Sequence, residues 1–388
     1  MSPIDATPVI RPVFIAGTGA VTPFGRGASC LVSSVIEGRS ALRKLERLAG
    51  TSCSARVAAE FPHDVMEDAG DTDQLAFHVS RWAGLEALDA APVISRKAMG
   101  LVLSTTKADL SGIIDAGRRE AGGVQLGLGS PQRLGERLVR DLEIAGPMAA
   151  VSCACASGLS AIAVASRWIA HGRLDHVLVI GVDVLNDFVL SGFASLLALD
   201  SEPCRPFDES RAGLSLGEAA GAILLTSDQK ASTGVRVAGW GGSNEAHHIT
   251  RPHPDGIGLR LAASRALRMA DVAPSKVACV HLHGTGTLYN DAMEANALAT
   301  LFEGTTPPAF GSKAQTGHTL GAAGIIESLI AVSALTRGEC PSNVGLQNPG
   351  VDSRLDLTMG RRKLSEHQAV LKVAAGFGGI GAAVVYAT

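Results

Sequence analysis

A cysteine at the start of a predicted helix is the first candidate for chemistry. Val151–Gly158 reads VSCACASG and runs into an apolar segment that ends at Gly172. Cys155 would lie within a residue or two of the first helical turn, where free N–H groups and the helix dipole stabilise negative charge. A thiol in that position loses its proton more readily and becomes a nucleophile. Two small core cysteines, Cys153 and Cys155, would explain the same letters equally simply.

Two histidines follow glycine-flanked ends of elements. His283 lies at the exit of a predicted strand in VACVHLHGTGT, with His281 on the same face. His318 lies in GSKAQTGHTLGAAG before a predicted helix, with Lys313 upstream and Glu327 one turn inside. An imidazole near a helix N-terminus stays neutral and can donate a hydrogen bond to a developing oxyanion. The pattern therefore predicts a nucleophile with two electrophilic donors.

A metal and a nucleotide are the alternatives for these segments. Cys153 and Cys155 with His281 and His283 could offer two sulfurs and two nitrogens to zinc, but the C-x-C spacing is narrower than zinc sites use. The glycines of VAAGFGGIG fit G-x-G-x-x-G, yet only seven residues follow them, too few for a crossover helix. We predict no metal and no bound cofactor, and interpret this last segment as a flexible turn around Phe377.

Composition narrows the function classes. The chain has 388 residues, 46 % of them apolar and 18 % charged, which is enough for a large core. A formal charge of −3 offers no basic face for nucleic acid. Seven scattered cysteines and the absence of a signal-like start predict a reducing, cytoplasmic location. The segment 144–166 carries no charge, but its Pro, Gly, Ser and Cys content predicts burial in protein and not in a membrane.

Short β-branched runs alternate with Ala-rich helical runs, which is typical of a layered α/β fold. The predicted strands are Val13–Ala20, Gly100–Ser104, His176–Val184, Ala220–Thr226, Val235–Trp240, Val277–His283, Leu371–Ala375 and Ala382–Ala387. The predicted helices are Ala28–Gly38, Gln74–Ala90, Ser157–His171, Gly258–Ala270, Asp291–Phe302 and Ala322–Arg337. Residues 1–12 and Leu126–Pro131 are predicted to be irregular. The second half repeats the order of the first, so we predict two similar halves, 1–230 with the cysteine and 231–388 with both histidines.

Taken together, these segments resemble the β-ketoacyl–acyl-carrier-protein synthases of the thiolase superfamily, especially the elongating enzymes. The resemblance runs almost end to end. It is carried, in the family's order, by VFIAGTGAVTPFG, SCACASG, CRPFDESRAGLSLGEAAGAILL, EAHHITRPHPDG, HGTGTLYNDAMEANAL, SKAQTGHTLGAAGIIESL and GFGGIGAAVV. It implies a thiolase-like fold in which duplicated α/β halves form a five-layer αβαβα sandwich.

The resemblance also implies roles for the site residues. Cys155 would accept the acyl group, and His283 and His318 would complete a Cys-His-His triad. Lys313 and Glu327 would support the electrostatics of the site. The reaction implied is decarboxylative condensation of an acyl thioester with malonyl-acyl carrier protein, in fatty-acid, polyene or polyketide synthesis.

Further positions concern the substrate. Phe377 would gate the pocket, and Thr285 and Thr287 would hold the phosphopantetheine arm of the carrier. Many relatives have a small, apolar segment after the strand Gly100–Ser104, where this chain reads STTKADLSG. Lys107 would therefore line the acyl pocket and favour a short, polar or conjugated acyl group, unless it points to solvent. Ile380 and Gly381 replace the Thr-Asn of many relatives, a change expected to loosen the gating loop.

The expected partners are an acidic acyl carrier protein and a second copy of this chain, or a ketosynthase-like chain-length factor in a heterodimer. Candidate carrier receptors are Arg205, Arg118, Arg119, Arg133, Arg137 and Arg140. A non-catalytic chain-length partner and a thiolase acting on coenzyme A esters remain alternative functions. The sequence does not determine chain length, pathway or docking residues.

Overall fold

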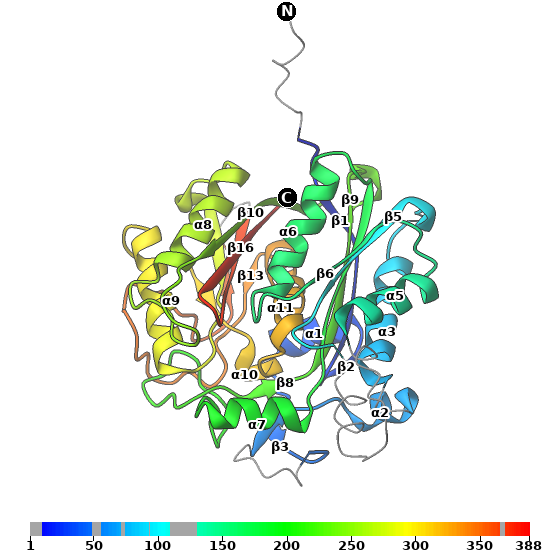
Figure 1. Cartoon of the computed structure of the whole chain (residues 1–388). Coiled ribbons are helices and arrows are strands. Elements are labelled where there is room, and N and C mark those ends of the chain that lie inside the picture. Colours follow the sequence, from blue (N-terminus) through cyan, green and yellow to red (C-terminus); the bar gives the residue numbers. More distant parts are fainter. Residues whose placement is uncertain (1–9, 49–55, 71–73, 93, 109–129, 365–368) are drawn as a thin grey trace, which may run out of the picture.

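Helices and strands alternate in five layers in the computed structural model, which describes residues 10–48, 56–70, 74–92, 94–108, 130–364 and 369–388. From right to left in Figure 1 the layers are helices α3 and α5, one half of the sheet, a central helical layer, the other half of the sheet, and helices α8 and α9. The thiolase-like αβαβα sandwich is therefore confirmed.

Eleven strands form the main sheet. They are β1 (Phe14–Thr22), β2 (Gly25–Arg26), β5 (Met99–Ser104), β6 (Met148–Val151), β7 (His176–Asp183), β9 (Ala219–Thr226), β10 (Arg236–Asn244), β11 (Val277–His281), β12 (Ala309–Phe310), β15 (Ala369–Gly376) and β16 (Ile380–Ala387). Smaller sheets contain β3 (Arg43–Lys44), β4 (Val57–Ala59) and β8 (Leu216–Gly217), and β13 (Glu339–Cys340) with β14 (Arg362–Lys363).

The strand order repeats between the two halves. The first half runs β1-β9-β7-β5-β6 and the second runs β10-β16-β15-β11-β12, each with two antiparallel and then two parallel pairings. The halves join where β1 pairs with β10 at Phe14 and Arg236. The duplication expected from the sequence is thus visible in the topology, while the boundary at residue 230 stays a prediction.

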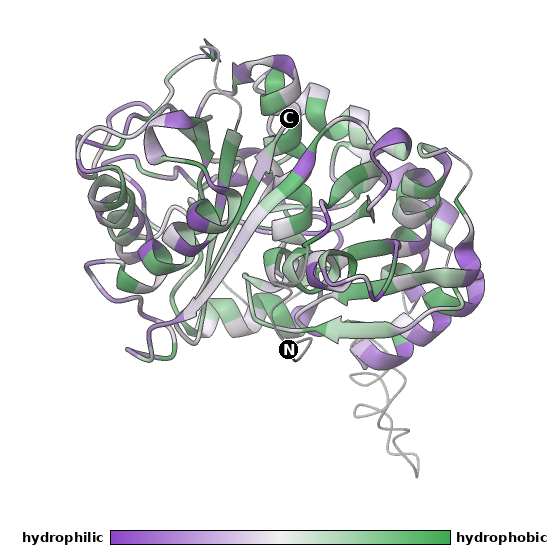
Figure 2. Ribbon diagram, turned by 90° about the horizontal axis from the view of Figure 1, so that it is seen from above, coloured by the Kyte–Doolittle hydropathy of each residue, from purple (hydrophilic) through white to green (hydrophobic). Residues whose placement is uncertain are grey.

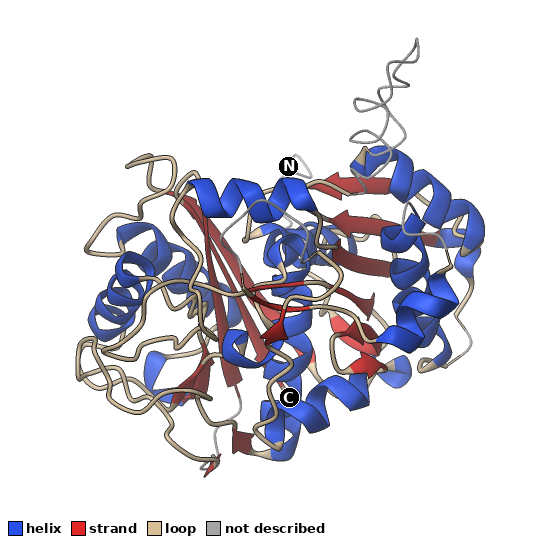
Figure 3. Ribbon diagram, turned by 90° about the horizontal axis from the view of Figure 1, so that it is seen from below, coloured by secondary structure: helices blue, strands red, loops and turns tan. Residues whose placement is uncertain are grey.

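Most of the helices lie in the outer and central layers (Figure 3). They are α1 (Ala28–Ile36), α2 (His63–Ala69), α3 (Leu75–Asp89), α5 (Pro131–Asp141), α6 (Ser157–Ala170), α7 (Asp187–Ser195), α8 (Ile257–Ala270), α9 (Leu288–Leu301), α10 (Lys313–Thr316) and α11 (Ala323–Arg337). The predicted helices all exist, with ends shifted by up to three residues. The sequence analysis missed the helices α2, α5, α7 and α10 and the short strands β2, β3, β4, β6, β8, β12, β13 and β14. The predicted loop Leu126–Pro131 overlaps α5 at Pro131, and residues 126–129 lie outside the described ranges.

The central helices α6 and α11 cross in backbone contact. A Cβ on Gly158 would lie 2.7 Å from the Cα of Gly324, and one on Gly324 would lie 2.5 Å from the backbone nitrogen of Leu159. Only glycine permits that approach. The crossing brings the start of α6, which follows Cys155, beside the start of α11, which follows His318 (Figure 1).

The position of α6 and α11 in the central layer explains why they are mostly apolar. Both faces of α6 and α11 meet a half of the sheet, and one apolar cluster fills the space between them. Hydrophobic segments accordingly gather in the middle of the molecule (Figure 2). Leu320–Arg337 is long and apolar enough to cross a membrane, but 78 % of that segment is buried inside the protein, as in a core helix.

Candidate active site

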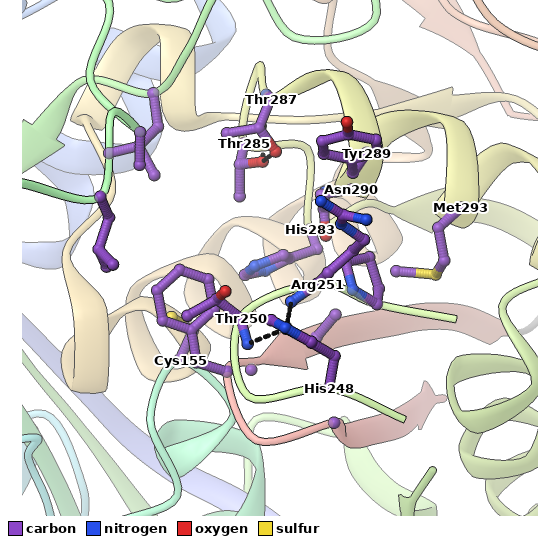
Figure 4. A pocket seen from close by; sticks show the side chains of 18 of the residues that line it. Cys155, His248, Thr250, Arg251, His283, Thr285, Thr287, Tyr289, Asn290 and Met293 are labelled. Atoms are coloured by element: carbon purple, nitrogen blue, oxygen red, sulfur yellow. Dashed lines mark hydrogen bonds between the residues drawn. The ribbon is translucent and has the colours of Figure 1, made fainter. Parts of the chain in front are cut away.

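The turn before α6 presents Cys155 to a cavity. Ala154 adopts a positive φ of 48°, and the turn is closed by hydrogen bonds from the Ala156 N–H to the Cys153 carbonyl and from the Cys153 N–H to the Ser157 hydroxyl. Cys155 itself is 7 % exposed. This tight turn directs the sulfur away from the helix and into the cavity (Figure 4).

Both predicted histidines face that sulfur. The Nε2 of His318 lies 3.0 Å from the Sγ of Cys155. The rings of His283 and His318 are nearly perpendicular, with centroids 5.4 Å apart. The sulfur and one nitrogen of each ring lie within 4.8 Å of one another. The structure therefore brings together the three side chains that the sequence singled out.

Lys313 fixes the tautomer of His283. Its buried ammonium lies 3.3 Å from the Nδ1 of His283 and also donates to the carbonyl of the same residue. An ammonium group can only donate, so Nδ1 must be the unprotonated nitrogen. Nε2 then carries the hydrogen as a donor. His318 differs, because its Nδ1 has no hydrogen-bond partner among the described residues and either tautomer fits.

A buried carboxylate neutralises two ammonium groups behind the histidines. Glu327 accepts from Lys313 at 2.5 Å and pairs with Lys372 at 2.7 Å. Lys372 is fully buried in β15, and sequence reasoning missed it, because a lysine within VLKVAAG gives no local sign of its partners.

The two imidazoles stay neutral for a different main reason than the one inferred from the sequence. Burial lowers the pKa values of His283 and His318 well below the ordinary value, and the charges of Lys313 and Lys372 lower them further. Burial also raises the pKa of the Cys155 thiol to about 11, although Lys313 and the Phe377 N–H oppose that rise. The prediction of a readily ionised thiol at the helix start is therefore wrong: the resting cysteine is protonated and needs a base within reach.

This gives a pH prediction for the resting enzyme. Because the thiolate reacts and the pKa of Cys155 lies near 11, the rate of alkylation by iodoacetamide should rise about tenfold for each pH unit between 7 and 10. Intact mass after timed quenching measures the rate, with glutathione as the reference thiol. A rate that levels off below pH 8 would contradict the raised pKa.

The segment that contains Gly376 and Phe377 packs against Cys155. Phe377 donates its N–H to the sulfur of Cys155. Its neighbour Gly376 packs so closely that a Cβ there would lie 3.3 Å from the nitrogen of Cys155. The ring of Phe377 stacks on Phe193 with centroids 6.0 Å apart. The N–H groups of Cys155 and Phe377 thus form a candidate oxyanion hole under an aromatic cover.

The cavity has a volume of about 330 Å³ and opens past polar residues. Thr285 and Thr287 line it, with their hydroxyls 3.0 Å apart. Near them the guanidinium of Arg251 lies over the ring of Tyr289, 4.8 Å from its centroid (Figure 4). Sequence reasoning did not find Arg251 or Tyr289, although both belong to quoted segments. The opening offers hydroxyl donors and one cation to a polar chain.

Lys107 does not line this cavity. Its ammonium is buried against Asp183, 3.0 Å from Oδ1, and Asp183 also accepts from Thr105, Thr106 and Gly321. The prediction that Lys107 binds substrate is thus contradicted by its position, and so is the alternative that it points to solvent. Asp109, the acidic residue of the segment STTKADLSG, lies outside the described residues.

Two further acids, which the sequence analysis missed, hold the loop after β11. Glu294 accepts from the N–H groups of His283 and Gly284 at 2.5 and 2.8 Å. Asp291 accepts from the N–H groups of Thr285 and Gly286. Both acids come from α9. The spacing D-x-x-E after HGTGT was the available signal, since it places two carboxylates on one helical face.

The proposed zinc set does not form. His281 instead stacks on Phe310 and contacts the Ser312 hydroxyl, and the metal-like group of the described residues is Cys155, His283 and His318. A dication there would lie beside the ammonium groups of Lys313 and Lys372, which repel it. The site therefore favours anions that develop during a reaction.

Two adjoining sequence-family models match this chain. The β-ketoacyl synthase N-terminal domain matches residues 10–231 and the C-terminal domain matches residues 235–347. The chain belongs to the β-ketoacyl synthase family. Family membership fits the site, in which one cysteine and two histidines share a cavity.

Individual relatives agree with this assignment. A mitochondrial 3-oxoacyl-[acyl-carrier-protein] synthase of Arabidopsis thaliana is 30 % identical, with 97 % of this chain and 93 % of that protein covered. The solved ishigamide ketosynthase/chain length factor has a TM-score of 0.89 at 26 % identity, covering 98 % of this chain and 99 % of the other. A chain of the solved complex between the ketosynthase ApeO and its chain length factor ApeC of Xenorhabdus doucetiae has a TM-score of 0.81 at 26 % identity, covering 97 % of this chain and 98 % of the other.

Proposed function

We propose that the protein is a 3-oxoacyl-acyl-carrier-protein synthase that condenses an acyl thioester with malonyl-acyl carrier protein. The observation that supports this most directly is the 3.0 Å contact between Cys155 and His318, with the Nε2–H of His283 in the same cavity. The reaction uses no metal or bound nucleotide.

The first half-reaction is acyl transfer to Cys155. The thiol gives its proton to the Nε2 of His318, and the sulfur attacks the carbonyl carbon of the acyl thioester. The N–H groups of Cys155 and Phe377 stabilise the tetrahedral oxyanion. Collapse breaks the bond to the carrier sulfur, which takes the proton from His318 and leaves as a thiol. Lys313 opposes any lasting charge on the imidazole, which favours this return of the proton.

The second half-reaction makes the carbon nucleophile. Malonyl-carrier loses carbon dioxide, and the electron pair of the broken bond forms an enolate whose negative charge lies on the thioester oxygen. His283 donates its Nε2–H to that oxygen. His318 donates as well from the tautomer that carries its hydrogen on Nε2, which it reaches by proton exchange with water between the two half-reactions. The enolate carbon attacks the acyl-cysteine, the intermediate expels the Cys155 thiolate, and a proton from water restores the thiol.

The carrier protein brings both substrates. A phosphopantetheine arm is a polar chain, and the hydroxyls of Thr285 and Thr287 at the opening suit it. Of the predicted carrier receptors, Arg118 and Arg119 lie outside the described residues. Arg137 donates to Gln74 and stacks on Phe77, while Arg205, Arg133 and Arg140 remain proposed receptors. Free cysteines throughout the described part support a cytoplasmic location.

A second copy of this chain is the proposed structural partner. The strand β6 is the end of the main sheet and is uncharged and only partly buried. An edge strand with free N–H and carbonyl groups can pair with another chain. The complex of ApeO with its chain length factor supports a heterodimer as the alternative.

Two other functions can be distinguished from the proposed one by experiment. A non-catalytic chain-length partner would need no nucleophile, whereas this site has the full set of Cys155, His283 and His318. A thiolase acting on coenzyme A esters would use those esters as readily as carrier thioesters.

One experiment separates the three. The purified protein alone is incubated with a panel of acyl-carrier primers and malonyl-carrier, and intact mass identifies the carrier product. We expect a 3-oxoacyl-carrier two carbons longer than the primer, and its preferred length would also define the acyl group. No product from the chain alone, with product after adding a partner ketosynthase, would identify a chain-length partner. Carbon–carbon cleavage of 3-oxoacyl coenzyme A would identify a thiolase.

A further inference from the structure

A lysine lies in the interior of the main sheet, where a side chain would ordinarily be apolar. Lys372 is fully buried in β15, between β11 and β16. Taking an ammonium group out of water costs several kcal/mol, and replacing a buried ion pair by apolar groups is often neutral or stabilising. Packing alone therefore does not account for a lysine at this position.

The ammonium of Lys372 is held by oxygen atoms next to the active site. It donates to the carbonyl of Leu282 at 2.8 Å and to that of His281 at 3.4 Å, and it pairs with Glu327 Oε2 at 2.7 Å. We call these three oxygens the ammonium cage. Glu327 Oε1 accepts from Lys313, whose ammonium contacts His283. One carboxylate thus connects Lys372 to the side chain of His283.

The cage also acts on the backbone that carries His283. Its strongest carbonyl contact is to Leu282, the residue directly before His283. Glu294 accepts from the N–H of His283, and Lys313 donates to its carbonyl. Buried charged groups therefore hold the peptide on each side of His283. In the part of the chain that the structure describes, neither Cys155 nor His318 is hydrogen-bonded to Lys372.

We propose that Lys372 is a positioning residue for condensation, whose ammonium in the cage aligns the Nε2–H of His283 with the malonyl thioester oxygen. This assignment rests on the proposed function and adds a residue to it. Since the contacts of the cage lead to His283 and not to Cys155 or His318, loss of Lys372 should slow decarboxylation more than acyl transfer to Cys155.

Lys372→Met tests the split between the two half-reactions. An error of about 1 Å in alignment lowers a rate about 10²-fold, so we expect decarboxylation of malonyl-carrier to fall about 10- to 100-fold. Acylation of Cys155, followed by intact mass, should change less than about threefold because its groups lie outside the cage. Lys363→Met, at an exposed position of β14, is the matched control and should leave both rates unchanged.

The pH profile gives a second readout that a structural role would not move. The charged and titratable groups around His283 are Lys313 of α10, Glu327 of α11, Glu294 of α9, Lys372 of β15, and His281 and His318. Removing one positive charge makes protonation of His283 less unfavourable. The acid limb of decarboxylation should therefore move to higher pH in Lys372→Met.

Lys372→Ser tests the cage directly. It leaves three oxygen atoms around a space that held an ammonium group, so ammonium chloride should restore decarboxylation several-fold. Tetramethylammonium chloride, which is too large for the space, provides the same ionic strength and should not. Melting temperatures of all variants are measured in parallel.

The outcomes are distinct. Wild-type rates and an unshifted profile in the Lys372 variants would reject the positioning role. Equal loss of acylation and decarboxylation, with a lower melting temperature and no rescue, would identify Lys372 as a structural residue. That result would also reject the positioning role. A wild-type protein that does not decarboxylate malonyl-carrier would reject the proposed function itself, which separates the two failures.

Discussion

Cys155→Ala should abolish condensation while malonyl decarboxylation continues. Without the sulfur no acyl-enzyme forms, and we expect the yield of 3-oxoacyl-carrier to fall by at least about 10⁴-fold. The enolate, however, is stabilised by His283 and His318. Of these two rings, His318 contacts the sulfur, at 3.0 Å, and His283 contacts Lys313. Acetyl-carrier should therefore still form within about tenfold of the wild-type rate. Mass spectrometry of the carrier reports both products.

Cys153→Ala is the matched control for that variant. Cys153 lies two residues earlier in the same turn, is partly buried and does not line the cavity. Its replacement should leave condensation within about threefold. Persistent labelling and condensation in Cys155→Ala would eliminate the proposed mechanism. Loss of both activities only in Cys153→Ala would transfer the nucleophile to the other cysteine.

The features predicted most accurately from the sequence are the helices that consist of long apolar runs. Helices α6 and α11 were predicted to within one residue, because each is a largely apolar stretch followed by a glycine, Gly172 or Gly338. Their crossing at Gly158 and Gly324 was not predictable, since each glycine alone fits any helix. The missed helix α5 did have a signal, since Ser130 caps it and Pro131 occupies its first turn.

The burial and the partners of charged side chains were predicted least accurately, for a physical reason. A charge in a short segment indicates solvent exposure unless its partner is known, and the partners here come from distant elements. Lys107 pairs with Asp183 of β7, and Lys372 pairs with Glu327 of α11. The same limit applied to the thiol of Cys155. Its local position at a helix start predicted a lower pKa, and burial by the rest of the fold reversed the direction.

The structure places His283 and His318 together at Cys155, as the sequence predicted, because that prediction did not depend on one local effect. Each lies at a glycine-flanked element end, and both meet Cys155 once the halves of the sheet are assembled. Neutrality was correctly predicted, although burial and two lysines supply it in place of the helix dipole. A site made of neutral donors next to buried cations suits an enolate, which carries its charge only during the reaction.

Replacing either histidine by alanine should therefore stop malonyl decarboxylation. Removing one preorganised donor from a developing oxyanion lowers a rate about 10²- to 10³-fold, so His283→Ala and His318→Ala should each fall in that range. The two differ in the other half-reaction. His318 lies 3.0 Å from the sulfur, so its loss should also slow acylation of Cys155, whereas His283→Ala should leave acylation nearly unchanged.

The control for these variants is His281→Gln. The ring of His281 stacks on Phe310 and lies outside the cavity lining, so this change should leave decarboxylation within about threefold per folded molecule. Release of carbon dioxide from malonyl-carrier measures one half-reaction, and the mass of the acyl-enzyme measures the other. Full decarboxylation in His283→Ala would mean that the enolate forms elsewhere. Equal acylation defects in His283→Ala and His318→Ala would contradict the assignment of His318 as the base that acts on Cys155.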